Sequence, residues 1–151
     1  MEQIIQLNSQ AKLSDHFTLG EMTKSNSHPE VYNIPSHEAI ANLKRVCSWL
    51  EVLRERSGGP VRINSGYRSP QLNKKIGGVP TSNHLTGCAA DIRVSGIEQL
   101  IRYATILLDI SDESQEDFDE LLIERSPKGS YWLHFAVRPT NNRRKVRLIQ
   151  T

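Results

Sequence analysis

The sequence predicts an α+β domain in which helices pack on one face of a small, mostly antiparallel sheet. Two stretches carry apolar residues at three- and four-residue steps, the spacing of core-facing helices. Four short stretches alternate apolar and polar residues, as half-buried strands do. The chain has 151 residues, of which 37% are hydrophobic and 24% are charged. Because this size and composition fit one folded unit, residues 1–151 are expected to form a single domain.

The elements follow in order from local patterns. Residues 1–35 are expected to form an irregular N-terminal arm with short elements. The first helix begins after Ser36, which can cap it, and ends at Gly58. Its apolar stripe comprises Ile40, Leu43, Cys47, Leu50 and Leu53. A second helix is predicted from the spacing of Ile97, Leu100, Ile101, Ala104, Leu107 and Leu108.

Strands are predicted at residues 61–64, 89–94, 120–124 and 131–137. A turn rich in Ser, Pro and Gly joins the last two strands, which favours a hairpin. Residues 65–80 are expected to be loop, with one helical turn at 71–75.

Composition excludes several classes of protein. The net charge of +2 is too small to indicate nucleic-acid binding, and no binding motif accompanies the basic C-terminal run. That run and the acidic run at 112–120 are interpreted as solvated surface. No stretch is long enough for a membrane span, and Cys47 and Cys88 do not form a disulfide framework. Because the start lacks a secretory signal, the chain is expected in the cytoplasm as synthesised.

Strand alternation predicts which side chains leave the core. The core side takes Ala90, Ile92 and Val94, then Leu121 and Ile123, then Leu133, Phe135 and Val137. Asp91, Glu120, Glu124 and His134 are therefore expected on the opposite face. If the strands pair in one sheet, these groups converge, and His84 can reach them from its turn.

This convergence indicates a metal site. Two imidazoles and one carboxylate suit Zn²⁺, and three protein ligands leave a fourth position open for water. A further carboxylate nearby would act as a general base. The pattern is that of a metal-assisted hydrolase.

Three motifs together resemble the M15 metallopeptidase family of zinc D-Ala-D-Ala carboxypeptidases and endolysin-type murein peptidases. They are Ser65-Gly66-Tyr67-Arg68-Ser69-Pro70, Ser82-x-His84-x-x-Gly87-x-Ala89-x-Asp91 and Trp132-Leu133-His134. The resemblance extends more loosely to residues 17–22 and the first helix. It implies a Hedgehog/DD-peptidase-like fold.

The resemblance also implies roles for individual residues. It gives His84, Asp91 and His134 as zinc ligands. It gives Arg68 as the group that holds a peptide carboxylate, for which a planar guanidinium is suited. Ser82 and Tyr67 are expected to line the same cleft. The alternative for Arg68 is a structural arginine that pins the long loop.

One departure concerns the catalytic carboxylate. Many family members carry an acidic residue three positions before the last His ligand, where this chain has Tyr131, and some carry a second His where it has Trp132. Glu124 is the expected replacement, since it shares the zinc face and lies near the hairpin turn. Glu120 shares that face but lies farther from the turn. A solvated strand glutamate is the alternative for Glu124.

The expected function is zinc-dependent hydrolysis of a peptide bond in peptidoglycan stem peptides. The enzyme would be a D-Ala-D-Ala carboxypeptidase or an L-Ala-D-Glu-type endopeptidase, and a monomer. It would act as a phage or prophage endolysin released by other means, or on recycled muropeptides. The alternative is a non-catalytic, zinc-containing murein-binding or phage structural module, with Tyr131 and Trp132 marking lost catalysis.

Overall fold

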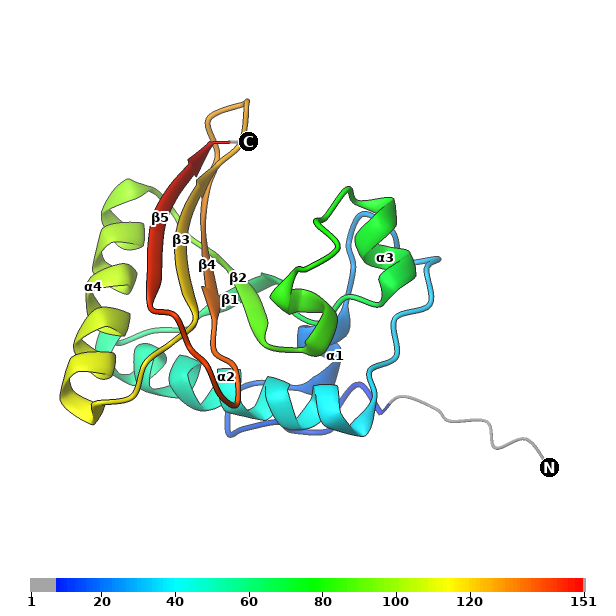
Figure 1. The fold of residues 1–151 in the computed structure, drawn as a ribbon, viewed down its shortest axis with the longest axis horizontal. Coiled ribbons are helices and arrows are strands. Elements are labelled where there is room, and N and C mark those ends of the chain that lie inside the picture. Colours follow the sequence, from blue (N-terminus) through cyan, green and yellow to red (C-terminus); the bar gives the residue numbers. More distant parts are fainter. Residues whose placement is uncertain (1–7, 151) are drawn as a thin grey trace.

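One five-stranded sheet organises the protein, as the computed structural model of residues 8–150 shows (Figure 1). The strands are β1 (Arg62–Ser65), β2 (Ala89–Arg93), β3 (Glu120–Arg125), β4 (Tyr131–Ala136) and β5 (Lys145–Gln150). They are ordered β1-β2-β4-β3-β5 across the sheet. Neighbours are antiparallel except β3 and β5, which are parallel. The predicted α+β class with a mostly antiparallel sheet is confirmed.

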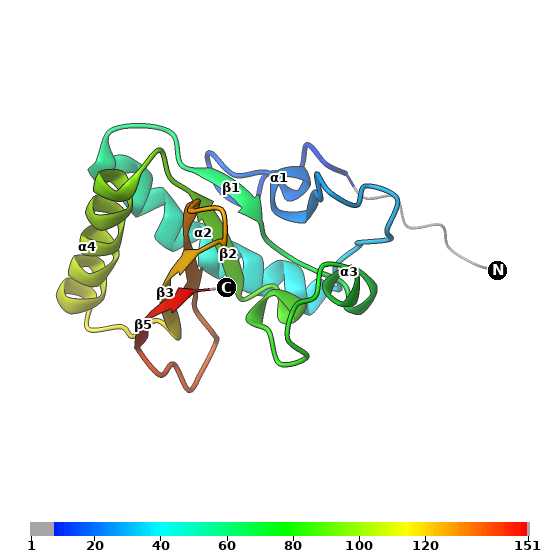
Figure 2. The same cartoon turned by 90° about the horizontal axis from the view of Figure 1, so that it is seen from above.

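Within residues 8–150, two long helices and three short ones accompany the sheet. They are α1 (Leu19–Thr23), α2 (His37–Ser57), α3 (Pro70–Lys75), the 3₁₀ helix η1 (Asn83–Thr86) and α4 (Ile97–Ser114). In Figure 1 the sheet is seen nearly edge-on, with α4 on one side and the α3–η1 segment on the other. Figure 2 shows α2 and α4 from above, with α3 and η1 away from α4. The side that carries α3 and η1 holds the predicted ligands.

The first long helix begins and ends as its sequence predicts. The Ser36 hydroxyl accepts a hydrogen bond from the Ala39 amide, which satisfies one of the free donors at the helix start. Gly58 ends the helix with a left-handed backbone, φ 79°, and donates its amide to the Arg54 carbonyl. Glycine adopts this conformation without a steric penalty.

The hydrophobic core lies between the helices and one face of the sheet. From α2 the core contains Leu43, Val46, Cys47, Leu50 and Leu53. From the strands it contains Ala90, Ile92, Leu121, Leu133 and Phe135. Trp49 packs against Phe135 and edge-on against Phe118, with ring centroids 5.4 and 6.4 Å away. The strand residues are those that alternation assigned to the core, so the predicted faces are confirmed.

The last strand was not expected from the sequence. Residues 145–148 alternate charged and apolar residues, but the stretch follows two arginines. It forms an edge of the sheet, where β3 is its only partner among residues 8–150. Leu148 is 74% exposed and Val146 is 43% exposed. An edge strand whose apolar residues stay exposed lacks the burial that makes alternation a reliable sign of a strand.

The interpretation of both charged runs as solvated surface is wrong for Asp119. Asp119 is completely buried, and its carboxylate binds Arg143 at 2.8 Å. Asp112 pairs with Arg144 at 2.9 Å. Parallel pairing of β3 with β5 brings the acidic and basic runs together, so they neutralise each other. A charge pattern read along one chain does not reveal such a partner.

Gly87 joins η1 to β2 at a position that a side chain would disturb. Its φ is +76°, and a Cβ there would lie 2.4 Å from the Ala39 carbonyl oxygen of α2. We expect Gly87→Ala to lower the free energy of unfolding by at least about 2 kcal/mol, measured by urea denaturation. Gly77 is the control, because its φ is +78° but nothing lies within 4 Å of its Cβ position. Equal losses in both variants would rule out the contact with α2 as the cause.

Candidate functional site

Three buried side chains that are far apart in sequence meet on the α3–η1 side of the sheet. They are His84 from η1, Asp91 from β2 and His134 from β4, whose ligand atoms all lie within 4.8 Å of one another. Asp91 and His134 are direct partners in the β2–β4 register. Asp91 Oδ1 lies 3.2 Å from His84 Nε2 and 3.0 Å from His134 Nδ1. The structure brings together all three residues expected as ligands.

His84 is held by its backbone and by one ring nitrogen. The Ser82 hydroxyl caps η1 by accepting a hydrogen bond from the His84 amide at 3.1 Å. The ring Nδ1 lies 2.6 Å from the Gly66 carbonyl oxygen. Because a carbonyl only accepts, Nδ1 carries the hydrogen and donates it. In the neutral ring, Nε2 then keeps a free lone pair that faces Asp91.

His134 is oriented by a carboxylate on its outer side. Its Nε2 lies 3.0 Å from Glu120 Oε1, so Nε2 donates there and Nδ1 faces the site. The same Glu120 oxygen accepts from the Asn83 side chain at 2.7 Å. A carboxylate behind a histidine ligand fixes its tautomer and raises its basicity as a donor. Glu120 is therefore suited to positioning His134.

The arrangement fits a tetrahedral metal ion. Zinc ligands about 2.1 Å from an ion at tetrahedral angles lie about 3.4 Å apart. The Asp91 oxygen already lies 3.0–3.2 Å from both imidazole nitrogens. Each imidazole has an acceptor for its other nitrogen, which leaves both rings ready to coordinate. Two imidazoles and one carboxylate form a donor set that suits Zn²⁺ and leaves one position open.

Charge interactions at the metal-free triad favour a protonated His134 ring. Burial alone would lower the pKa of His134, but hydrogen bonds with Asp91 and Glu120 outweigh it and raise that pKa to about 10. Burial would also raise the pKa of Asp91, but the charges and hydrogen bonds of His84 and His134 hold that pKa far below its usual value. The two carboxylates around His134 therefore favour the protonated form of its ring.

Zinc binding is expected to displace that proton. At pH 7.5 we expect release of about one proton per ion, because the ring is protonated before binding and neutral afterwards. Calorimetric titration in buffers of different ionisation enthalpy measures the number. Glu120→Gln should release fewer protons, since one of the two carboxylates that hold the proton is gone. Unchanged release in this variant would contradict the role of Glu120.

Arg68 contacts one of the predicted ligands. Its Nη2 lies 3.1 Å from Asp91 Oδ2, and its Nε donates to the Ser65 hydroxyl at 3.0 Å. Nη1 lies 3.4 Å from Asn73 Oδ1 in α3. Burial lowers the pKa of Arg68, while the Asp91 charge opposes that effect. Arg68 thus connects the loop after β1 to Asp91 and also lines the cleft.

The two candidate carboxylates differ in their contacts. His134 pairs across the hairpin with Leu122, so Glu120 and Glu124 lie two residues to either side on the same face. Burial would raise the pKa of Glu120, but its hydrogen bond with His134 outweighs burial and lowers it. The pKa of Glu124 is raised, chiefly by burial and then by the charge of Asp91. Trp132, its cross-strand partner, hydrogen-bonds with Glu124.

A cleft of about 530 Å³ opens beside the triad. The expected site residues in its wall are Arg68, Ser82, His84, Asp91, Glu124 and His134. Glu120 lines it as well, and β5 contributes Lys145 and Ile149. The contribution of β5 was not predicted from the sequence, because no strand was expected at residues 145–150.

Tyr67 does not line this cleft. Its side chain belongs to the core cluster and is 8% exposed, and its amide donates to the Met22 carbonyl at 2.8 Å. The large ring is buried in the core cluster, to which residues of the N-terminal arm also belong. The packing of that arm was not predicted from the sequence. The expected cleft-lining role of Tyr67 is therefore not supported.

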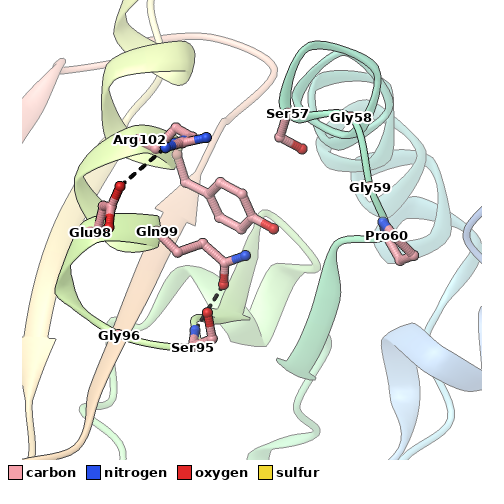
Figure 3. Close-up of a pocket in the computed structure, with 10 residues that line it drawn as sticks. Ser57, Gly58, Gly59, Pro60, Ser95, Gly96, Glu98, Gln99 and Arg102 are labelled. Atoms are coloured by element: carbon pink, nitrogen blue, oxygen red, sulfur yellow. Dashed lines mark hydrogen bonds and ion pairs between the residues drawn. The ribbon is translucent and has the colours of Figure 1, made fainter.

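A second pocket of about 470 Å³ lies between the end of α2 and the first half of α4 (Figure 3). Its wall includes the Gly58-Gly59-Pro60 turn and Tyr103. Glu98, the one carboxylate among its lining residues, is paired with Arg102 at 3.2 Å (Figure 3). It shares no residue with the cleft, and it lacks the combination of imidazoles and carboxylates found there. The candidate site is thus the cleft at the triad.

Comparisons with known proteins show which family the chain resembles. A family model described as Peptidase M15 matches residues 15–111. The match includes His84 and Asp91 and ends before His134. The zinc D-Ala-D-Ala carboxypeptidase of Streptomyces albus G is 32% identical over 78 residues. That stretch is 51% of this chain and 31% of the relative, so the similarity spans about a third of the relative's length.

No helix within residues 8–150 is both long and apolar enough to cross a bilayer.

Proposed function

The chain belongs to the peptidase M15 family, and on that premise we propose that it is a zinc-dependent peptidase acting on peptidoglycan stem peptides. The observation that carries the proposal is the His84–Asp91–His134 triad in a cleft whose wall also holds Glu124. The relative from Streptomyces albus G is named a zinc D-Ala-D-Ala carboxypeptidase. We extend that activity to this chain as a proposal.

His84, Asp91 and His134 would hold the ion. Zn²⁺ bound there supplies Lewis acidity, which activates water and polarises the scissile carbonyl. His84 would bind through Nε2 and His134 through Nδ1, because the other nitrogen of each ring donates to Gly66 or Glu120. Glu120 would hold the His134 ring in place during the reaction.

Glu124 would transfer the protons of hydrolysis. Its carboxylate takes a proton from the attacking water and passes it to the amine of the departing residue. Its pKa is raised by burial and by the charge of Asp91. A carboxylate with a raised pKa is a stronger base when ionised and releases the proton more slowly to solvent. Glu120 is less suited, since its carboxylate is already bound to His134.

Arg68 would anchor a substrate carboxylate while it supports Asp91. A guanidinium has five N–H donors, and contacts with Ser65, Asn73 and Asp91 use three of them. Two donors are left for a ligand in the cleft. The role as loop support and the role as substrate anchor are therefore compatible.

The test is turnover of a defined stem pentapeptide by the zinc-loaded protein, with products identified by mass spectrometry. Release of the last D-Ala indicates a carboxypeptidase, and cleavage after L-Ala indicates an endopeptidase. His134→Ala is expected to lose both zinc and turnover. Absence of any cleavage product from the zinc-loaded wild-type protein would contradict the peptidase proposal. Peptide binding without turnover would then favour a murein-binding module.

A further inference from the structure

One end of the cleft carries positive charge that the proposed reaction does not use. Arg138, Arg143 and Lys145 line this end, where β5 begins. Arg138 and Arg143 both bind Asp119, at 3.3 and 2.8 Å, so one carboxylate serves two guanidinium groups. Arg143 also lies 3.7 Å from Glu120, which already binds His134. Positive charge is therefore in excess at this end.

Lys145 is the cation available to a ligand. Its side chain forms no hydrogen bond or ion pair with any other residue between 8 and 150. It is half-buried in the cleft wall rather than fully solvated. Its direct partner in the β3–β5 register is Glu120, so it shares the face that carries the triad. An ammonium group in a cleft wall that has no protein partner favours an anionic ligand.

The order of strands places Lys145 across the triad from Asp91 and Arg68. The strands follow one another as β2, β4, β3 and β5. Asp91 on β2 is the direct partner of His134 on β4, whereas Glu120 on β3 and its partner Lys145 on β5 lie two residues along the strands from that pair. Neighbouring strands lie about 4.8 Å apart, so β2 and β5 are separated by about 14 Å. An extended peptide rises about 3.3 Å per residue. Two carboxylates three residues apart, together with the reach of a lysine side chain, fit this span.

We propose that Lys145 binds a second carboxylate of the substrate, on the opposite side of the triad from Arg68. The inference rests on the proposed function, because it takes the ligand to be a stem peptide. In such peptides D-Glu is linked through its side chain, which leaves its α-carboxylate free three residues before the C-terminus. With Arg68 on the terminal carboxylate and Lys145 on that of D-Glu, the last peptide bond lies at the triad. Lys145 thus selects the carboxypeptidase register.

The test measures binding rather than turnover. Zinc-loaded Glu124→Gln protein is titrated calorimetrically with a synthetic stem pentapeptide and with two analogues. One analogue carries a carboxamide in place of the D-Glu α-carboxylate, and the other carries a C-terminal carboxamide. We expect the first replacement to weaken binding about threefold to fivefold, the effect of one half-exposed ion pair. Adding Lys145→Met should reduce that penalty below about twofold and leave the penalty of the C-terminal carboxamide unchanged.

Arg147→Met is the matched control. Arg147 lies two residues along β5 on the same face, but it is exposed, hydrogen-bonds the Val146 carbonyl at 2.8 Å and is not among the residues that line the cleft. It should keep the full preference for the D-Glu carboxylate. The inference is overturned if the Lys145→Met protein keeps that preference or if the Glu124→Gln parent protein has none. It is also overturned if the parent protein binds none of the three peptides. Turnover by the wild-type protein is measured separately. A failure of the peptidase proposal is therefore seen in turnover and is distinguished from these three binding results.

Discussion

Glu124→Gln is expected to lower kcat on a stem peptide by about a thousandfold, within the range for loss of a general base. The amide has the shape of the carboxylate but cannot accept a proton from water. Because Glu124 forms no hydrogen bond or ion pair with the triad residues in the part of the chain that the structure describes, zinc content should stay at the wild-type level. Steady-state kinetics with metal analysis of the same samples measures both quantities.

Glu120→Gln is the control for that result. Glu120 lies on the same face of β3, equally far along the strand from Leu122, but it contacts His134. Its replacement should weaken zinc affinity by about tenfold to a hundredfold, and excess zinc should restore most turnover. The opposite pattern, with turnover lost only in zinc-saturated Glu120→Gln protein, would exchange the two roles.

Asp119→Ala is expected to lower the free energy of unfolding by about 3 kcal/mol, the low end of the range for breaking a buried ion pair. The carboxylate is completely buried and accepts from Arg143 at 2.8 Å and from Asn83 at 2.8 Å. Without it the buried Asn83 amide loses an acceptor. The guanidinium of Arg143 is half-exposed and regains water, which limits the loss. Chemical denaturation of metal-free protein measures the difference.

The effect of Asp119 should depend on pH in a defined direction. Burial would raise its pKa, but Arg143 and Asn83 outweigh burial and lower it to about 2. The stability it contributes is therefore present above its ordinary pKa near 3.8 and is lost as pH falls towards 2. The difference in the free energy of unfolding between wild type and Asp119→Ala should become smaller as the pH falls through that range. Asp112→Ala, which breaks an exposed pair with Arg144, should cost less than about 1 kcal/mol at any pH.

Alternation along strands was enough to predict the faces of the sheet. On β4 the apolar residues Leu133 and Phe135 flank His134, and burial of those two leaves His134 only the opposite face. The same reasoning applies to Asp91 on β2. His84 lies in no strand, so the prediction that it belongs to the site depended on the motif around it rather than on strand periodicity. The observed triad agrees with both arguments.

Alternation could not separate Glu120 from Glu124. Both lie diagonal to His134 in the hairpin register, and only the side-chain hydrogen bond to His134 distinguishes them. The sequence did not indicate the arginine partners of Asp119 either, because they lie in the loop before β5, a strand whose exposed apolar residues gave no clear signal. Such contacts between distant segments depend on which strands become neighbours. A single sequence does not report that.

The triad also has a mechanical consequence. Its members lie 7 and 43 positions apart along the chain, and the longer interval contains all of α4 and β3. An ion bound to all three would act as a cross-link that closes this interval, as a disulfide does. The chain-entropy relation for a loop of that length gives about 4 kcal/mol of stabilisation. Metal binding would then make α4 and the β3–β4 hairpin unfold as one cooperative unit, and removal of the metal by a chelator would destabilise both.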